Sequence, residues 1–223
     1  MIQKRFRVYA RGMKQFFAFA LCCAWIAPPT AVAGPSASEL CARIDSLYHK
    51  SPHWQVAFEQ KVHYPVFDEV ESESGRLGVG PKGTFRLTTD RYVIVSDGDT
   101  LWTHNLRANQ VTVDLVAKAG ETVRPADFLF RFKQEYRREL CEDAGPGTCV
   151  HLVAADETAF IREMWLWTDP ATAMVKRAVY KDINLNETTF EFKTVDFKYK
   201  PGTSDFRYEA PPGVEVVRLP SVD

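Results

Sequence analysis

Residues 91–105 read Arg-Tyr-Val-Ile-Val-Ser-Asp-Gly-Asp-Thr-Leu-Trp-Thr-His-Asn, and this stretch decides the fold class. Two runs rich in β-branched and aromatic residues flank Asp97-Gly98. An Asp-Gly pair between such runs is among the stronger hairpin signals, because a type I′ turn needs two positive φ angles. The stretch therefore predicts two antiparallel strands joined by a tight turn.

The strand pattern continues on both sides of this hairpin. Apolar and polar residues alternate over residues 54–59, 85–88 and 110–115, and β-rich runs follow at 161–168, 174–181 and 188–199. Many short strands separated by turn signals predict a mainly β protein with an antiparallel sheet or barrel. The sequence has no evident linker, repeat or low-complexity tract, so we expect one domain over residues 34–223.

Two segments depart from the strand pattern. Residues 36–39, Ser-Ala-Ser-Glu, read as a helix capping box, and apolar residues then recur at helical spacing until Pro52. An amphipathic helix is therefore expected over residues 38–50. Residues 120–130 do not alternate, and Pro125 at a first helical position predicts a second short helix over residues 125–132.

The N-terminal segment has the composition of an export signal. Five basic residues precede an apolar run over residues 16–27, and Ala31-Val32-Ala33 stands before Gly34. A short apolar core with a small-x-small site predicts a cleavable signal over residues 1–33, cut after Ala33. The alternative is an uncleaved membrane anchor, although about twelve apolar residues are few for a bilayer span.

Removing that segment changes the charge of the chain. The whole sequence has a net charge of −1, whereas residues 34–223 carry −6 because all five basic residues of the segment are lost. The acidic remainder argues against nucleic acid as a partner. Phe19-Ala20-Leu21 before Cys22 does not fit the usual lipid-attachment pattern, so we expect an exported protein without its own lipid anchor.

Three cysteines follow residue 33. Cys141 and Cys149 flank a short hairpin-like loop, and export permits disulfides, so these two are expected to be bridged. In the chain-entropy model, a bridge across so short a loop contributes about 2–3 kcal/mol. Cys41 is expected to be a buried thiol on the N-terminal helix.

The motifs of common enzymes and metal sites do not occur in the sequence. It has no HExxH, GxSxG or CxxC motif, and none of its five histidines has metal-ligand spacing. Residues 78–83 resemble a phosphate loop, but they lack its spacing and strand-to-helix context and are interpreted as a turn between strands. We therefore expect a protein that is not an enzyme and uses no cofactor or metal ion.

Two predicted strands are apolar on both faces. In residues 164–167, Met and Leu point one way and Trp165 and Trp167 the other. A later strand places Phe190 and Phe192 on one parity and Val195 on the other. Either a bulge near Thr194 reconciles them, or both faces of this strand are covered. Ordinary core packing is the competing interpretation for each aromatic residue. Together, a curved sheet and a helix over its concave face would offer a cavity for a lipid or acyl chain.

A set of short segments adds a family resemblance. They are Phe58-Glu59-Gln60-Lys61-Val62, Gly75-Arg76-Leu77, residues 81–85, residues 94–98 with Thr100-Leu101-Trp102, Gln110-Val111, residues 124–129 and Ala210-Pro211-Pro212-Gly213-Val214. In this order and spacing they are similar to the LolA family, periplasmic carriers of outer-membrane lipoproteins. The resemblance spans most of the chain after residue 33 and is weak over residues 132–188.

The resemblance implies a fold, a location and partners. The fold would be an unclosed antiparallel β-barrel with a lid of short helices, here residues 38–50 and 125–132, over an apolar cavity. The chain would be a monomer in the periplasm that carries acylated lipoproteins from an exporter complex of the inner membrane to an acceptor of the outer membrane. A related carrier or sensor for another amphiphile, such as a glycolipid, a polyketide or a lipid stress signal, is the alternative, and an enzyme on a barrel scaffold is the third hypothesis.

The resemblance and the strand parities together indicate which residues would line the cavity. We assign the lipid-binding lining to Leu40, Ile44, Leu47, Trp54, Phe58, Phe85, Leu87, Trp102, Phe128, Leu129, Trp165 and Trp167. The sequence does not determine which face of their strand Trp165 and Trp167 occupy.

One position departs from the family pattern. Family members commonly carry an arginine just before the proline of the turn at residues 80–83, where it helps to hold the lid closed. Here that position is Gly80, and Lys82 is the nearest basic residue. A lysine lacks the planar fork of an arginine, so the replacement of this latch by Lys82 is an open question.

Overall fold

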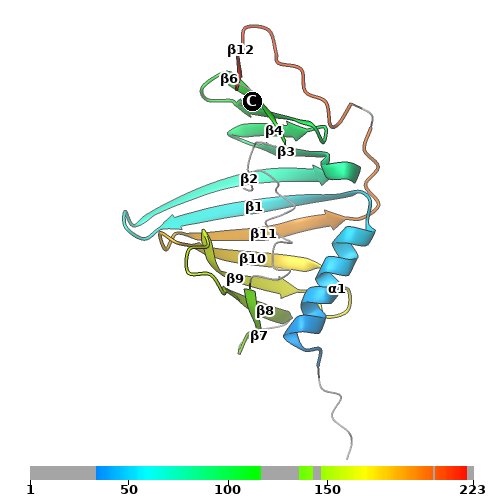
Figure 1. The fold of residues 1–223 in the computed structure, drawn as a ribbon, viewed down its shortest axis with the longest axis vertical. Helices are drawn as coiled ribbons and strands as arrows, with labels where there is room; N and C mark the ends of the chain where they lie inside the picture. The colour runs from blue at the N-terminus through cyan, green and yellow to red at the C-terminus, as the bar shows by residue number, and fades with distance from the viewer. Residues whose placement is uncertain (1–33, 117–135, 143–146, 203, 220–223) are drawn as a thin grey trace, which may run out of the picture. The chain divides into compact units, whose positions relative to one another are not determined.

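The structure is a computed structural model that describes residues 34–116, 136–142, 147–202 and 204–219. Within these residues the chain forms one twelve-stranded sheet and one α-helix, α1 (Figure 1). The strand order is β12-β6-β5-β4-β3-β2-β1-β11-β10-β9-β8-β7, so β12 and β7 are the edges and the sheet does not close. The prediction of a mainly β protein with an unclosed sheet is confirmed.

The elements have the following bounds. They are α1 (Ala37–Lys50), β1 (Trp54–Tyr64), β2 (Glu69–Val79), the 3-10 turn η1 (Pro81–Gly83), β3 (Phe85–Thr89), β4 (Tyr92–Ser96), β5 (Thr100–Asn105), β6 (Gln110–Leu115), β7 (Tyr136–Leu140), β8 (Thr148–Ala154), β9 (Ile161–Thr168), β10 (Val175–Asp182), β11 (Glu187–Asp196) and β12 (Glu215–Arg218).

The predicted hairpin at residues 91–105 is confirmed as β4 and β5, but its turn is not type I′. Only Gly98 has a positive φ, of 103°. The Asp97 Oδ1 atom accepts hydrogen bonds from the backbone N–H groups of Asp99 and Thr100, at 3.0 and 2.8 Å. The side chain of Asp97 therefore organises a longer loop that needs one left-handed residue instead of two.

Helix α1 begins with the predicted capping box. The Ser36 Oγ atom accepts from the Glu39 N–H at 3.2 Å, and the Ser36 N–H donates to the Glu39 carboxylate at 2.7 Å. These bonds satisfy N–H groups that have no partner inside the helix. They also lower the pKa of Glu39. The helix ends at Lys50, before Pro52, as the sequence predicts.

One face of α1 packs on the sheet, and we call the sheet surface beneath it the α1 face. Leu40, Cys41 and Ile44 are buried there. Tyr48 packs edge-on against Trp54 at a centroid distance of 5.3 Å, and its oxygen accepts the Val175 N–H at 3.3 Å. The helix is therefore held to the sheet by both apolar packing and a backbone hydrogen bond.

Of the two alternatives for β11, the structure has the bulge near Thr194. Ala57 pairs with Thr194, but the next residue, Phe58, pairs with Phe192, so Lys193 is skipped. This shift puts Phe192 and Val195 on the same face although their numbers have opposite parity. The last part of β11 therefore keeps its apolar residues on the α1 face.

The sheet departs from a purely antiparallel arrangement at one edge. β12 runs parallel to β6, with Val216 opposite Val111. The connection from β11 to β12 runs along the face opposite α1: the Arg86 Nε atom donates to the Asp205 carbonyl at 3.0 Å, and Tyr208 lies 2.6 Å from His104 Nδ1. A chain that crosses several strands in this way can add the last strand in the parallel direction.

Two predictions fall outside the described residues. They are the signal segment over residues 1–33 and the second lid helix over residues 125–132. Among the residues that the structure does describe, no helix is long and apolar enough to cross a membrane.

Candidate functional site

The α1 face carries a continuous apolar surface built by cross-strand pairing. In β1 to β3, Val56 pairs with Leu77, and Leu77 pairs with Leu87. In β8 to β10, Leu152 pairs with Met164, which pairs with Tyr180. Because residues paired across a sheet share a face, these rows extend across most of the strands. The buried residues of this surface are Trp54, Val56, Phe58, Leu77, Phe85, Leu101, Val150, Leu152, Met164, Leu166, Ala178 and Tyr180.

Seven of the predicted lining residues belong to this surface or to the helix that packs on it. Leu40, Ile44, Trp54, Phe58 and Phe85 are buried in it, and Leu47 and Leu87 are partly buried against it. Phe128 and Leu129 lie outside the described residues. The structure thus brings together residues from α1, β1 and β3 that are up to 47 positions apart in sequence.

Three predicted lining residues lie on the opposite face. Trp102 pairs with Val95 and Val113, which alternate with the α1-face residues of their own strands. Trp165 and Trp167 alternate with the buried Met164 and Leu166. The structure therefore does not bring these three tryptophans together with Phe58 and Phe85.

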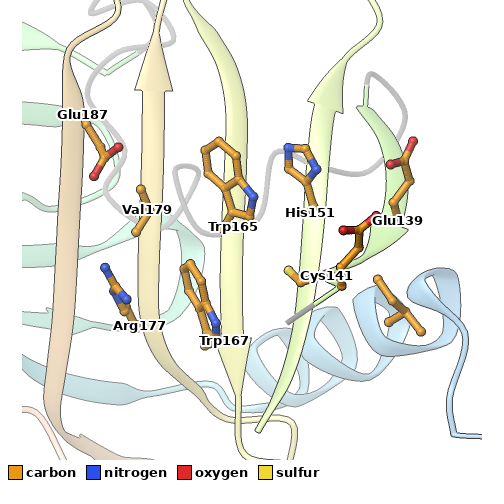
Figure 2. A pocket seen from close by; sticks show the side chains of 10 residues that line it. Glu139, Cys141, His151, Trp165, Trp167, Arg177, Val179 and Glu187 are labelled. Carbon is orange, nitrogen blue, oxygen red and sulfur yellow. The ribbon is translucent and has the colours of Figure 1, made fainter. Parts of the chain in front are cut away.

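Trp165 and Trp167 line a pocket of about 590 Å³ on this opposite face. Figure 2 shows the two indoles beside each other on β9, with α1 behind the strands. His151 stacks on Trp165 with a centroid distance of 4.5 Å and an interplanar angle of 5°, and the Arg177 guanidinium lies 4.7 Å from the Trp167 ring centroid. Each ring therefore has a polar or charged group against one of its faces.

Charged groups surround these two tryptophans. The His151 Nε2 atom lies 2.9 Å from a Glu163 oxygen, and the Arg177 Nε atom lies 3.2 Å from Glu191. Further carboxylates, Glu139 and Glu187, line the same pocket (Figure 2). This surface therefore mixes charged groups with aromatic rings, in contrast to the α1 face.

The disulfide lies at the rim of this pocket. Cys141 and Cys149 are joined, with their Cα atoms 5.3 Å apart, and the Cys141 N–H donates to the Cys149 carbonyl at 3.1 Å. The bridge ties the end of β7 to the start of β8, at one edge of the sheet. Cys41 is a buried free thiol whose pKa is raised, mainly by burial.

Two tyrosines bring hydroxyl groups into the apolar surface. Burial raises the pKa of Tyr48 to about 12, although the hydrogen bond from Val175 acts in the other direction. Burial also raises the pKa of Tyr180, and its neighbours Tyr48 and Tyr136 add to that effect. Both phenols are therefore neutral at physiological pH, and neither adds a charge to the α1 face.

The accessible part of the α1 face includes four residues that the sequence analysis does not assign to the lining. Val79, Ile94, Phe190 and Phe192 are only partly buried, and they pack against the core. None was assigned to the lining. The alternation of Phe190 and Phe192 with polar residues shows that the two rings share a face, but it does not show which face of the sheet that is.

The departure at Gly80 has a steric cause. A Cβ atom at this position would lie 2.4 Å from Cε2 of Phe206 and 2.5 Å from Oγ1 of Thr84. Any larger residue here, including an arginine, would therefore require the side chains of Phe206 and Thr84 to shift. Lys82 is exposed and has a left-handed φ of 56°. Its side chain makes no hydrogen bond or ion pair with the part of the chain that the structure describes.

The described residues do not include a group of three or more His, Cys, Asp and Glu side chains that could hold a metal ion. The features that remain for function are the apolar α1 face and the polar, aromatic pocket behind it. The first suits the burial of hydrocarbon, and the second suits a hydrated ligand or no ligand.

Comparisons with known proteins give a family match. Residues 50–209 match the family described as "Outer membrane lipoprotein carrier protein LolA". No curated protein matches the sequence.

Three solved structures illustrate the structural likeness. An uncharacterized conserved protein from Thermus thermophilus has a TM-score of 0.54 and 16% identity, covering 82% of this chain and 99% of its own. The LolA superfamily protein NE2245 from Nitrosomonas europaea has a TM-score of 0.40 and 10% identity, covering 78% and 99%. LprF from Mycobacterium bovis has a TM-score of 0.39 and 12% identity, covering 76% and 99%.

The first of these structures shares the fold. The family match spans more than two thirds of the sequence, from the end of α1 to the segment before β12. The chain therefore belongs to the LolA family of outer-membrane lipoprotein carrier proteins.

Proposed function

We propose that this protein is a periplasmic carrier that holds the acyl chains of a lipoprotein against its α1 face. It would take the lipoprotein from an exporter complex in the inner membrane and deliver it to an acceptor at the outer membrane. The observation that carries the proposal is the apolar α1 face, on which Leu77, Phe85 and Leu152 lie together with partly buried Leu87 and Phe192. Membership of the LolA family supports it.

The energetics of acyl chains explain why a carrier is needed. Each buried CH₂ group contributes about 0.8 kcal/mol, so two or three chains represent tens of kcal/mol of burial in the membrane. A lipoprotein therefore cannot cross an aqueous compartment at a useful rate by itself. The α1 face can replace part of that burial. Its apolar residues form rows across neighbouring strands, such as Val56, Leu77 and Leu87.

Release requires that the burial be reversible. Ligand-induced opening or closing is possible only if the two states differ in their affinity for the acyl chains. Helix α1 is the described element that covers this face, held through Tyr48 and through Arg43, whose guanidinium donates to the carbonyl groups of Pro170 and Ala171 at 3.0 Å each. We propose that movement of this helix relative to the sheet changes the apolar area offered to the cargo.

The remaining parts of the proposal come from the sequence. Export with cleavage after Ala33 would place the mature chain in the periplasm. Its acidic character would favour solubility of a protein with an apolar binding surface. We propose that it acts as a monomeric carrier without a cofactor, and not as an enzyme.

A matched pair of variants on β3 tests the proposal. Leu87 is partly buried on the α1 face, and its neighbour Thr88 is exposed on the opposite face. Leu87→Glu places a charge among the proposed acyl chains, so we expect it to extract little or no acylated lipoprotein from spheroplasts. Thr88→Glu adds the same charge one residue away and should extract lipoprotein as the wild type does.

Folding is monitored in parallel, by circular dichroism and thermal unfolding of both variants. Leu87 is a better position than the buried Phe85, where a glutamate would also disturb the core. Equal extraction by the wild type and by folded Leu87→Glu would contradict the proposal. Mass spectrometry of the bound material separates a lipoprotein from another amphiphile such as a glycolipid or polyketide.

A further inference from the structure

A charged network borders the apolar part of the α1 face on β2. Strand β2 pairs with β1 without a register shift, so Leu77, Gly75, Glu73 and Glu71 share this face. Leu77 is buried, and the ring of Phe58 lies over Gly75. The two glutamates lie nearer the β1–β2 hairpin, at the end of the strand away from α1 (Figure 1). The face therefore changes from hydrocarbon to charge between successive positions of one strand.

Arg91 joins the two carboxylates. It follows β3, and its Nη1 and Nε atoms donate to Glu71 and Glu73 at 2.7 and 3.1 Å. The side chains of Arg91 and Glu73 are 25 and 10% exposed, so the network is partly buried but can still be reached. The hydrogen bonds to Glu73 and Glu71 raise the pKa of Arg91, since they favour its charged form.

The guanidinium of Arg91 retains hydrogen-bonding capacity after these two contacts. An arginine has five N–H groups in one plane. The bonds to Glu71 and Glu73 use two of them, and the other three have no acceptor in the part of the chain that the structure describes. Donors of this kind at the border of an apolar surface suit a ligand that ends in an oxygen acceptor.

Other charged groups of this region have different surroundings. Glu69 and Asp90 are exposed, and so is Arg107 in the turn after β5. None of these three has a hydrogen bond or ion pair with Arg91 among the described contacts. Arg162 before the middle of β9 donates to backbone carbonyl groups of the loop that precedes its strand. Arg91 differs from Arg162 because its described partners leave the same face of the guanidinium network beside the aromatic residues of β1 and β11.

These aromatic residues lie directly next to the network. Gln60 of β1 pairs with Glu73 on one side and with Phe190 on the other. Phe190 lies 5.5 Å from Phe58 and 6.2 Å from Phe192, measured between ring centroids. Every acyl chain ends in a carbonyl group, whether it is linked as an ester or as an amide. A chain that lies along these rings can therefore bring its carbonyl to the charged network.

We propose that Arg91 donates hydrogen bonds to the carbonyl oxygens of the bound acyl chains and so selects chains with an ester or amide linkage. The inference rests on the proposed carrier function and specifies where the linkage of the cargo lies. A neutral carbonyl suits this guanidinium because Glu71 and Glu73 already balance its charge, whereas a phosphate group would be repelled by the two carboxylates.

Two lipopeptides that differ only in their linkage test this assignment. One carries two palmitoyl chains as glyceryl esters, and the other carries two hexadecyl chains as glyceryl ethers, which lack the carbonyl groups. In isothermal titration the wild type is expected to bind the ester form about tenfold more tightly. Arg91→Met should bind both forms with equal affinity. Arg76→Met is the matched control, since Arg76 is exposed on the opposite face of β2, and it should keep the wild-type preference.

The outcomes separate this inference from the carrier function. Equal binding of the two forms by the wild type, or an ester preference that folded Arg91→Met retains, would overturn the role of Arg91. The wild-type comparison decides the question even if thermal unfolding shows that Arg91→Met is unfolded. Wild type that binds neither lipopeptide would overturn the carrier function and this inference together, whereas equal binding of both forms would leave the carrier function intact.

Discussion

The two faces of the sheet are built from the same strands but differ in chemistry. On the α1 face, Leu166 and Met164 are almost completely buried among other apolar residues. One position along the same strand, Trp165 stacks on His151 and Trp167 lies beneath Arg177. Aromatic content alone therefore does not make a face of this sheet apolar. What distinguishes the α1 face at Leu166 is that its partners on both adjacent strands, Val150 and Ala178, are also apolar.

The largest expected effect is the difference in stability between alanine variants of Leu166 and Trp165. Leu166→Ala removes a fully buried side chain and should lower the free energy of unfolding by about 2–5 kcal/mol. Trp165→Ala removes a half-buried ring over a hydrated pocket and should cost about 1 kcal/mol. Urea unfolding of both variants measures the difference. Equal losses would mean that the two faces are equally packed.

The disulfide gives the next effect, on the edge that borders the polar pocket. Cys141→Ser/Cys149→Ser should lower the free energy of unfolding by about 2–3 kcal/mol through the loss of loop closure. Alkylation of the denatured, non-reduced protein lacking residues 1–33 should modify Cys41 alone. Three modified thiols would contradict the bridge. The α1 face should be unaffected, so lipoprotein extraction by the folded variant is expected to be unchanged.

A smaller effect is expected from the pH dependence of Tyr48 on the α1 face. Burial raises its pKa to about 12, above the value of about 10 in an unfolded chain. Its contribution to stability is therefore present below pH 10 and is lost as the pH rises towards 12, by about 2 kcal/mol.

Tyr48→Phe is the variant that isolates this titration. It loses the hydrogen bond from the Val175 N–H, at a cost of about 1 kcal/mol at neutral pH. Between pH 10 and 12 its stability should fall less steeply than that of the wild type, while every other tyrosine titrates in both proteins. Parallel curves for the two proteins in urea unfolding would show that Tyr48 is not shielded from water by the helix.

Local patterns in the sequence predict much of this fold. The Asp-Gly hairpin, the capping box of α1 and the bulge in β11 each follow from a few neighbouring residues, and each is present. The first part of β2, Glu-Val-Glu-Ser-Glu-Ser, has no apolar alternation and was not predicted as a strand. It belongs to a hairpin with exposed positions on both faces, so burial does not impose a pattern on it.

The candidate site is less predictable. The alternation of residues along a strand shows which side chains share a face, but it does not show which face packs against the helix. The sequence establishes that Trp165 opposes Leu166, but only the position of α1 determines which of them faces the helix. The same reason explains the placement of Trp102. Phe206 packs on Gly80 although the two residues are 126 positions apart in the sequence, and no local pattern predicts this contact.

The most direct test of the acyl-carrier account is native mass spectrometry of the protein purified from the exporting cell. The account predicts wild-type protein with a bound acylated lipoprotein or acyl lipid, Thr88→Glu with the same ligand, and folded Leu87→Glu without it. Wild-type protein without any acyl ligand, or a ligand retained equally by Leu87→Glu, would contradict the assignment of the α1 face as the cargo site.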